Sequence, residues 1–352
     1  MNRKLLFSLI LLSACVSCKA KPEPSPEPEP VPVVKSFAKG ADIGWVTEME
    51  SKGYKFYNAA GQERECTALM KELGCNAIRH RVWVDPSKGE THANWCNMED
   101  LLVKCRRVKA CGMDLMVDFH YADGWADPGK QPIPASWTDH SAAALAQNVA
   151  EHTKSVLQAL KDAGVNVKWV QVGNEVTNGM LWETCRVKGS DAANFVKVFN
   201  AGAKAVKEVY PDAKVILHID NAWKTETVKW FYDLVTSAGA KFDIIGLSLY
   251  PSYWEGSGYP AWETKVSKAV NYLSTIYSSY RKEIMLVEFG MPASEPGKAK
   301  EALKYILDKT KDMDFFTGVF LWEPESEKSR NGYDYGAFKD GKATEAMNPF
   351  KN

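Results

Sequence analysis

The chain has 352 residues, of which 45% are hydrophobic and 25% charged, and its basic and acidic residues are equal in number. This is the composition of an ordinary globular protein, with enough length for one large core or two smaller ones. The formal net charge of zero and the lack of a long basic run argue against nucleic acid as a partner. Twelve tryptophans are a high number, and their flat apolar faces suit sugar rings as well as a protein core.

The first residues have the pattern of an export signal. Arg3 and Lys4 precede an apolar stretch and then small residues before Cys15, and the stretch is too short for a membrane-spanning helix. The segment "LSAC" that ends at Cys15 resembles a bacterial lipobox, in which cleavage leaves the cysteine as a lipid-modified N-terminus. We therefore expect a lipoprotein signal peptide over 1–14 and lipidation of Cys15, with an ordinary signal peptide cut nearby as the alternative.

A Pro/Glu-rich linker is expected to follow over 15–36. Proline at every second or third position forbids a helix and favours an extended, solvated spacer. Acyl chains on Cys15 would hold the protein at a membrane, since each buried CH₂ group is favourable by ~0.8 kcal/mol. We expect an exported, monomeric lipoprotein at the outer membrane or cell surface of a Gram-negative-type bacterium. Which leaflet carries it stays open.

The cysteines beyond the leader carry no recognisable metal or redox motif. They are Cys66, Cys75, Cys96, Cys105, Cys111 and Cys185. Six cysteines allow fifteen pairings, and no C-x-x-C pair occurs among them. Export makes disulfides chemically allowed, but a domain of this size does not need them, so their pairing stays unassigned.

From residue 37 onward, strand-like and helix-like segments alternate. Strands are predicted at 37–46, 75–84, 113–121, 167–175, 214–220, 242–250, 283–290 and 315–324. Helical patterns lie between them, such as those over 140–164 and 190–210, which both begin at capping-type residues. Eight such units predict an α/β fold, a single-domain (β/α)₈ TIM barrel over 37–352. The alternative, an open doubly wound sheet, would more often carry a G-x-G-x-x-G loop after its first strand, and none follows.

Polar and aromatic residues gather at the C-terminal ends of these predicted strands. In the fourth strand the two-residue period places Gln171, Gly173 and Glu175 on one face and Val170 and Val172 on the other. The other strand ends contribute Asp42, Arg79, Arg81, Trp83, Asp118, His120, His218, Asp220, Ser248, Tyr250 and Trp322. Because unpaired buried polar groups cost free energy, and barrel enzymes place their chemistry at this face, the pattern predicts an active site there.

Two glutamates stand out because each directly ends an apolar strand. Glu175 ends the fourth strand, and Glu288, which the period groups with Ile284 and Leu286, ends the seventh. Alone, each is more readily explained as a helix cap or an ion-pair member. Together they form the minimal equipment for glycoside hydrolysis, in which one carboxyl stays protonated and the other ionised.

The environments of the two carboxyls must therefore differ. An arginine close to Glu288, either Arg79 or Arg81, would keep that carboxyl ionised. Proximity to the resulting anion and partial desolvation would raise the pKa of Glu175. This assignment makes Glu175 the proton donor and Glu288 the attacking group.

Several segments together resemble the arabinogalactan endo-β-1,4-galactanase family of clan A retaining glycoside hydrolases. At the level of the clan, "VGNE" matches the acid/base position on strand four and "VEFG" the nucleophile position on strand seven. The family is indicated more narrowly by "GADIGWV", "IRHRVWVDP", "DFHYADGWADP", "VGNEVTNGMLW", "HIDNAW", "GLSLYP" and "LWEP". The resemblance spans essentially all of 37–350, in order, and implies a TIM barrel that cleaves internal β-1,4 bonds of pectic galactan.

The resemblance also implies roles for individual residues. Glu175 would be the general acid/base and Glu288 the nucleophile, with Asn174 bonded to the sugar 2-hydroxyl. Asp42, Arg79, His120, Asn174, Tyr250 and Trp322 would line the subsite of the cleaved sugar, and Asp220 is a weaker candidate. Trp125, Trp182 and Trp223 are either stacking platforms or packing at the barrel rim. No cofactor is implied.

The eighth loop departs from some bacterial relatives, which carry a longer, calcium-binding loop there. Asn331, Asp334 and Asp340 lie in this region but lack the spacing of a calcium loop, so no required metal is predicted. After Glu288 the sequence reads "FGMP", where many relatives have a different small or polar residue. Product length and tolerance of arabinose branches stay open.

Two other functions fit parts of the sequence. One is another clan A endo-glycanase of mannanase or xylanase type. The other is a non-catalytic, glycan-binding surface lipoprotein, which the predicted anchor and the tryptophan content fit equally well. Binding alone, however, needs no paired carboxyls, so the Glu175–Glu288 pair favours the enzyme.

Overall fold

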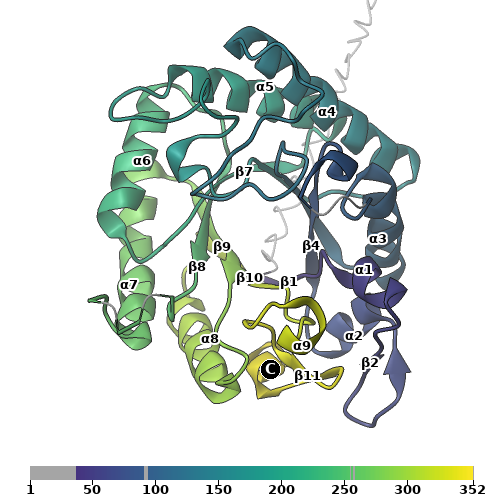
Figure 1. Cartoon of the computed structure of the whole chain (residues 1–352). Helices are drawn as coiled ribbons and strands as arrows, with labels where there is room; N and C mark the ends of the chain where they lie inside the picture. The colour runs from purple at the N-terminus through teal and green to yellow at the C-terminus, as the bar shows by residue number, and fades with distance from the viewer. Residues whose placement is uncertain (1–36, 91–93, 254, 257, 352) are drawn as a thin grey trace, which may run out of the picture. The chain divides into compact units, whose positions relative to one another are not determined.

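Eight parallel strands close into a barrel in the computed structural model, which describes residues 37–90, 94–253, 255–256 and 258–351 (Figure 1). Around the barrel each strand pairs with the one before it in the chain, and β1 closes the ring against β10. The strands are β1 Ala38–Asp42, β4 Ala77–Val82, β5 Asp114–Phe119, β6 Trp169–Val172, β7 Lys214–Ile219, β8 Ile244–Leu249, β9 Glu283–Phe289 and β10 Phe316–Trp322. All eight lie within the predicted strand ranges, and the predicted TIM barrel is confirmed.

Helices surround the strands on the outside (Figure 1). They are α1 Val46–Ser51, α2 Cys66–Glu72, α3 Met98–Cys111, α4 Ala142–Asp162, α5 Ala193–Val209, α6 Thr225–Ser237, α7 Trp262–Tyr280, α8 Pro296–Thr310 and α9 Lys328–Asn331. Short 3₁₀ helices cover Pro86–Lys88, Val176–Asn178 and Glu345–Lys351. Helix α4 shows why such segments form: the Ser141 hydroxyl accepts a hydrogen bond from the Ala144 N–H, and Leu145, Val149 and Val156 turn inward at helical spacing.

Two separate apolar layers form the core, one inside the barrel and one between strands and helices. Trp169 belongs to the inner layer, whereas its neighbours Val170 and Val172 belong to the outer one, as the two-residue period predicts. The inner layer consists of Ala38, Ala77, Met116, Trp169, Ile216, Ile244, Met285, Val287 and Phe320. These side chains fill the barrel, so the polar groups further along the strands collect above a solid apolar floor.

A β-bulge in β9 changes the predicted direction of one catalytic candidate. Ile284 and Leu286 pack in the outer layer, as alternation requires. After Leu286 the pairing with β8 skips a residue, so both Val287 and Glu288 turn toward the inside of the barrel. The expectation that Glu288 shares a face with Ile284 and Leu286 is therefore wrong, because the extra residue resets the alternation.

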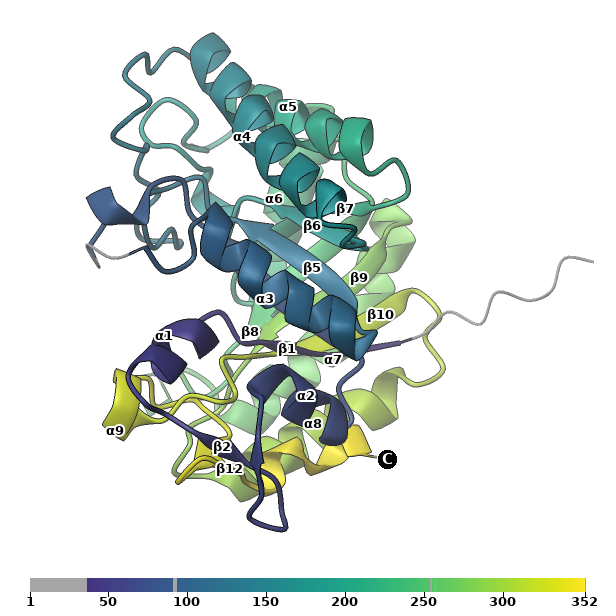
Figure 2. The same cartoon turned by 90° about the vertical axis from the view of Figure 1, so that its right-hand side faces the viewer.

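A small second sheet lies beside the barrel and was not predicted. It contains β2 Phe56–Tyr57, β3 Glu63–Arg64, β11 Phe338–Lys339 and β12 Lys342–Ala343, in the order β11-β12-β2-β3. In Figure 2, β2 and β12 lie next to each other near α2, although they come from opposite ends of the chain. The sheet ties the loop after β10 to the segment after α1.

Residues Lys35–Asn352 form one unit. The predicted signal peptide over 1–14, the lipidation site Cys15 and the whole linker over 15–36 lie outside the described residues. Within the described part, no helix has the length and apolarity needed to cross a bilayer. Each of the six cysteines of this unit has a free thiol.

Candidate active site

A cavity of about 590 Å³ opens at the C-terminal ends of the barrel strands. It brings together most of the residues that the sequence singles out. Those on its wall are His120, Trp125, Asn174, Glu175, Asp220, Tyr250, Glu288 and Trp322. They come from six strands, β5 to β10, or the loops that directly follow them, so convergence of strand ends explains the clustering.

Asp42 and Arg79 differ from the expectation that they line the sugar subsite. Both side chains are fully buried and stay off the cavity wall. Arg79 Nη1 lies 2.6 Å from Asp42 Oδ2, and Arg79 Nη2 lies 2.8 Å from Asp118 Oδ2. Arg79 lies within β4 and Asp42 ends β1, and a buried charge is tolerated there only with partners. Arg79 contacts the wall residues Glu288 and Asn174 from the buried side, and Asp42 holds Arg79 in place.

Glu288 is held by a cation and a phenol. Arg79 Nη2 lies 2.9 Å from Glu288 Oε1, and the Tyr250 hydroxyl donates to Glu288 Oε2 at 2.7 Å. Burial raises the pKa of Glu288, while Arg79 and the Tyr250 hydrogen bond act to lower it. Both of these contacts favour the ionised form, which is the form that a nucleophile needs.

Glu175 stands in a different environment. Burial raises its pKa well above the ordinary value, and the negative charges of Glu288 and Asp220 raise it further. Its carboxyl lies at the floor of the cavity, where protein surrounds it although one part of its surface stays accessible. Burial raises the pKa of both glutamates, but that of Glu175 lies well above its ordinary value, whereas Glu288 has Arg79 and Tyr250 beside it to favour its anion. This difference favours Glu175 as the carboxyl that keeps its proton.

A sharp turn at the end of β6 presents Glu175 to the cavity. Gly173 has φ +82°, and a Cβ there would meet Val176 Cγ1 at 2.7 Å. Glu175 itself has φ 46°, in the left-handed region, and the 3₁₀ helix Val176–Asn178 begins directly after it. Glycine satisfies the first positive φ without strain, which lets the strand end abruptly. A non-glycine residue at positive φ is uncommon and is typical of functional sites.

Asn174 is fixed in one orientation by its neighbours. Its Oδ1 accepts from Arg79 Nη2 and from Gln171 Nε2, both at 3.1 Å. Its Nδ2 donates to the Ala126 carbonyl at 2.9 Å. Since an amide nitrogen has two hydrogens, one N–H remains for another acceptor. Asn174 also lines the cavity, so this N–H is available to a sugar hydroxyl there.

A wall of tryptophans flanks the two carboxyls. The ring centroids of Trp322 and Trp125 are 5.9 Å apart, and Trp45 contacts both rings at 5.3 and 5.6 Å. The guanidinium of Arg81 lies 4.5 Å from the centroid of Trp125 and is ion-paired with Glu323. Such a wall offers apolar surface with little side-chain freedom to lose.

Trp182 and Trp223, the other two tryptophans considered as stacking platforms, lie away from this wall. Trp182 donates its indole N–H to the Asn178 carbonyl and lies against Arg186, and Trp223 is buried against Tyr259 and Lys265. Neither lines the cavity. Trp125 does line it.

Tyr253 and Asn221 also line the cavity wall, although the strand pattern of the sequence did not indicate them. Tyr253 stacks on Tyr250 with centroids 5.1 Å apart and 18° between the ring planes. Asn221 follows Asp220 directly. Both lie in loops past the strand ends, where the two-residue period no longer applies. The only available signal was their closeness in sequence to Tyr250 and Asp220.

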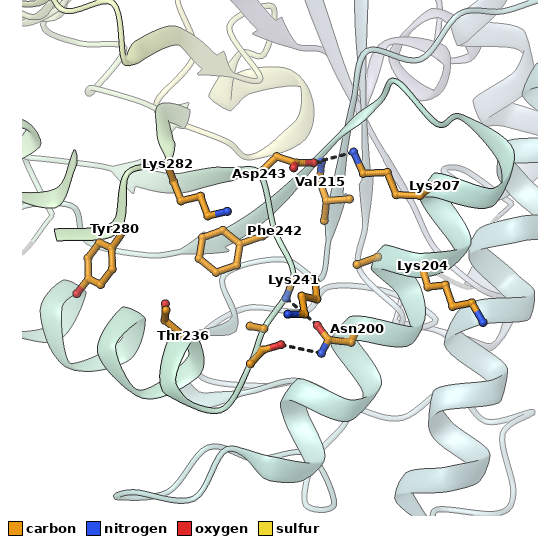
Figure 3. A pocket seen from close by; sticks show the side chains of 13 residues that line it. Asn200, Lys204, Lys207, Val215, Thr236, Lys241, Phe242, Asp243, Tyr280 and Lys282 are labelled. Carbon is orange, nitrogen blue, oxygen red and sulfur yellow. Dashed lines mark hydrogen bonds and ion pairs between the residues drawn. The ribbon is translucent and has the colours of Figure 1, made fainter. Parts of the chain in front are cut away.

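A second hollow, of about 630 Å³, lies near the N-terminal ends of β7 and β8 (Figure 3). Lysines dominate its rim: Lys204, Lys207, Lys241 and Lys282. Its one carboxylate, Asp243, is ion-paired with Lys207 at 2.9 Å. Without a second carboxyl this hollow lacks the equipment for acid–base catalysis on a glycoside.

Two of the three eighth-loop residues discussed for calcium have other partners. Asp334 is ion-paired with Lys328 at 2.8 Å, and Asn331 donates to the Ser326 hydroxyl at 2.9 Å. Among the residues that the structure describes, no group of three or more His, Cys, Asp or Glu side chains could hold a metal ion.

Comparison with known proteins gives a consistent result. Residues 38–315 match the family model described as glycosyl hydrolase family 53. A probable arabinogalactan endo-β-1,4-galactanase A of Neosartorya fischeri is 35% identical over 268 residues, which are 74% of this chain and 71% of that one. An arabinogalactan endo-β-1,4-galactanase of Humicola insolens is 33% identical over 264 residues, or 73% and 75% of the two chains.

A solved structure agrees with these matches. It comes from work on two fungal β-1,4-galactanases and superposes with a TM-score of 0.78 at 27% identity, over 89% of this chain and 98% of that one. The resemblance noted from the sequence motifs is thereby confirmed, and the protein is a glycoside hydrolase. The chain belongs to glycosyl hydrolase family 53.

Proposed function

We propose that the protein is a retaining endo-β-1,4-galactanase that hydrolyses internal bonds of pectic galactan and arabinogalactan. The observation that carries the proposal is the pair Glu175 and Glu288 in one cavity, with environments that separate their protonation states. The names of the relatives support galactan as the substrate.

The reaction proceeds by double displacement. Glu288, ionised beside Arg79, attacks the anomeric carbon while Glu175 protonates the departing glycosidic oxygen. Glu175 then acts as base toward a water molecule that releases the covalent glycosyl-enzyme. The two carboxyl groups of a retaining enzyme stand ~5–5.5 Å apart, which leaves no room for a water in the first step.

Neighbouring groups serve the transition state. The remaining N–H of Asn174 donates to the 2-hydroxyl of the cleaved sugar, a contact that strengthens as charge develops on the ring. Trp322 stacks on that sugar, with Trp125 beside it. His120 and Tyr250 complete the subsite, and Asp220 borders it.

A substrate panel tests the specificity. The purified protein should release reducing ends from linear β-1,4-galactan, with much slower release from β-1,4-mannan, xylan and arabinan. The axial C4 hydroxyl of galactose bends the chain differently from a mannan, which is why one groove does not serve both. Faster cleavage of mannan or xylan would contradict galactan as the substrate and would indicate an endo-glycanase of mannanase or xylanase type instead.

Removal of the nucleophile tests the mechanism. Glu288→Ala should abolish release of reducing ends from galactan, whereas Glu301→Gln, at an exposed position on α8, should match the wild type. Unchanged activity of Glu288→Ala would refute the assigned mechanism. A protein that binds galactan without cleaving it would favour the surface glycan-binding alternative.

We further propose export and lipid anchoring through Cys15, on the sequence pattern alone. The full-length protein expressed in a Gram-negative host should partition with membranes, and Cys15→Ser should shift it to the soluble fraction. Equal partitioning of the two proteins would rule the anchor out.

A further inference from the structure

Two buried side chains next to Glu175 have no part in the mechanism as described above. His218 is on β7 and Ser248 on β8, and both are almost fully buried. Neither contributes to the cavity wall. Buried polar side chains at such a position are costly unless they are hydrogen-bonded, so their partners define their role.

The backbone of Glu175 determines which nitrogen of His218 carries the proton. The Glu175 N–H donates to His218 Nδ1 at 3.3 Å, so Nδ1 must present a lone pair. The single proton of the neutral ring then sits on Nε2, which lies 2.7 Å from Ser248 Oγ and donates to it. The ring stays neutral because burial, with Arg79 and His120 nearby, lowers the pKa of His218 well below its ordinary range.

The hydroxyl proton of Ser248 is thereby directed to one acceptor. Ser248 Oγ receives its hydrogen bond from His218, so its own proton must point elsewhere, and a hydrogen bond from this hydroxyl is among the influences that lower the pKa of the Glu175 carboxyl. Each bond of the chain has a fixed direction, from the imidazole to the hydroxyl to the carboxyl. The chain returns through the Glu175 N–H to the imidazole, which closes a ring around the proposed acid/base.

We propose that His218 and Ser248 are positioning residues: His218 holds the backbone of Glu175 and orients Ser248, and the Ser248 hydroxyl donates a hydrogen bond to the carboxylate form of Glu175. This inference rests on the proposed function, because it assigns Glu175 as the acid/base. In the first step Glu175 becomes an anion when it gives up its proton, and the Ser248 hydroxyl stabilises that anion. In the second step the same bond orients the carboxylate toward the attacking water.

The test separates proton donation from general disruption. Ser248→Ala removes one oxygen from a buried site without adding volume, so it should fold. On galactan its kcat/KM should fall about ten- to a hundredfold, the worth of one hydrogen bond to a charged group. On a β-1,4-galactobioside with a dinitrophenolate leaving group, which departs without a proton, kcat/KM should stay within about threefold of wild type.

The pH profile gives a second readout. Ser248 acts to lower the pKa of Glu175, so its loss should move the alkaline limb of kcat/KM on galactan to higher pH. The titratable groups that face Glu175 are Glu288, Asp220, Arg79, Tyr250 and Tyr253, and those that face His218 are Arg79 and His120. All of these groups remain in Ser248→Ala, so a shift of the alkaline limb would be caused by the loss of the hydroxyl.

Two further variants complete the experiment. Ser248→Thr keeps the hydroxyl and should restore most of the activity and the original limb. His218→Asn, too short to reach Ser248, should shift the limb in the same direction as Ser248→Ala. Equal losses on both substrates with an unmoved limb would overturn the proposal and leave a purely structural role. If Glu175→Gln cleaves galactan like the wild type, the proposed function fails instead.

Discussion

Arg79 is the residue on which the charge balance of the site depends. One guanidinium contacts Asp42, Asp118 and Glu288 at 2.6 to 2.9 Å, and it also donates to Asn174. Its planar fork suits several carboxylates at once, in a way that a single ammonium does not. Arg79 therefore links a buried structural cluster to the proposed nucleophile.

Arg79→Gln should damage both catalysis and stability. Since Arg79 acts to lower the pKa of Glu288, its loss should raise that pKa and move the acid limb of kcat/KM to higher pH. Three carboxyls would lose a buried partner, and the free energy of unfolding should fall by about 3–5 kcal/mol. The pH–rate profile and urea unfolding measure the two effects. An unmoved acid limb would show that Arg79 does not set the ionisation of Glu288.

Asn174 permits a prediction of a different kind. Asn174→Ala removes the N–H proposed for the 2-hydroxyl, a contact made chiefly in the transition state. On galactan, kcat and kcat/KM should fall together, by about 10²–10³, as for other preorganised donors. If KM rises while kcat is kept, the contact is one of ground-state binding, and the proposed role is wrong.

At the level of residues, the sequence was informative where chemistry and position coincide. Glu175 and Glu288 were found because each ends an apolar strand, and Asn174 because it precedes Glu175 in a motif that resembles the family. The network of His218 and Ser248 was not, because hydrogen-bond direction depends on backbone geometry that a sequence does not display. The side of β9 on which Glu288 lies was also predicted wrongly, because the β-bulge that changes it cannot be recognised from residue types.

Among the elements, the loop after β10 has a burial pattern that its sequence does not suggest. Its glutamates Glu323, Glu325 and Glu327 are buried, although acidic residues in a loop are ordinarily exposed. Glu323 pairs with Arg81 and accepts from the Trp45 N–H, and Glu327 accepts from the Tyr54 hydroxyl and the Gly341 N–H. The short loop is thus anchored from within, which fixes the tryptophan wall.

Glu323→Ala tests this anchoring. It would leave the buried Arg81 with only Asp42, 4.0 Å away, as a carboxylate partner in the described structure. The free energy of unfolding should fall by about 3–5 kcal/mol, and KM for galactan should rise as Trp45 and Trp125 lose their fixed neighbour. Urea unfolding and initial rates measure these changes.

Glu301→Ala, on the exposed face of α8, is the matched control and should stay within about 0.5 kcal/mol of the wild type. A Glu323→Ala protein as stable as this control would mean that the Arg81 ion pair contributes nothing net.

Elements with a repeated pattern were predictable, and those without one were not. The barrel strands show runs of apolar residues between helical segments, and all of them were located. The strands of the small sheet have two residues each and pair across nearly the whole chain, as Tyr57 does with Lys342. Two residues show no period, so only the folded barrel brings these segments together.

For the molecule as a whole, buried histidines link stability to pH. Burial lowers the pKa of His80 and of His218 far below the ordinary range, and that of His152 to about 4. The unfolded chain takes up protons on these side chains below pH ~6.5, whereas the folded chain does not. Proton uptake by the unfolded state lowers the free energy of unfolding as the pH falls.

Carboxyls work in the opposite direction, since burial raises the pKa of Asp42, Glu175, Glu288 and Glu325. Their protons are kept by the folded state between about pH 4 and their raised pKa values, so this part of the stability is lost as the pH rises. The total pH dependence is a sum of both signs. A variant that removes a single histidine isolates one contribution.

His80→Leu is such a variant, since His80 is fully buried on β4, where Lys104 and Arg107 of α3 act on its imidazole. Its unfolding free energy relative to the wild type should increase as the pH falls below ~6.5, by at most ~1.4 kcal/mol per pH unit. Urea unfolding at pH 7, 6 and 5 measures the difference. A difference independent of pH would contradict a neutral, buried His80.

The central claim is that Glu288 attacks the sugar directly and that Glu175 protonates the departing oxygen. Its most direct test is proton NMR of linear β-1,4-galactan during hydrolysis. New reducing ends should appear first as the β-anomer, with mutarotation following, while chain length falls from the start. Initial formation of the α-anomer would place a water, not Glu288, at the anomeric carbon and contradict the account.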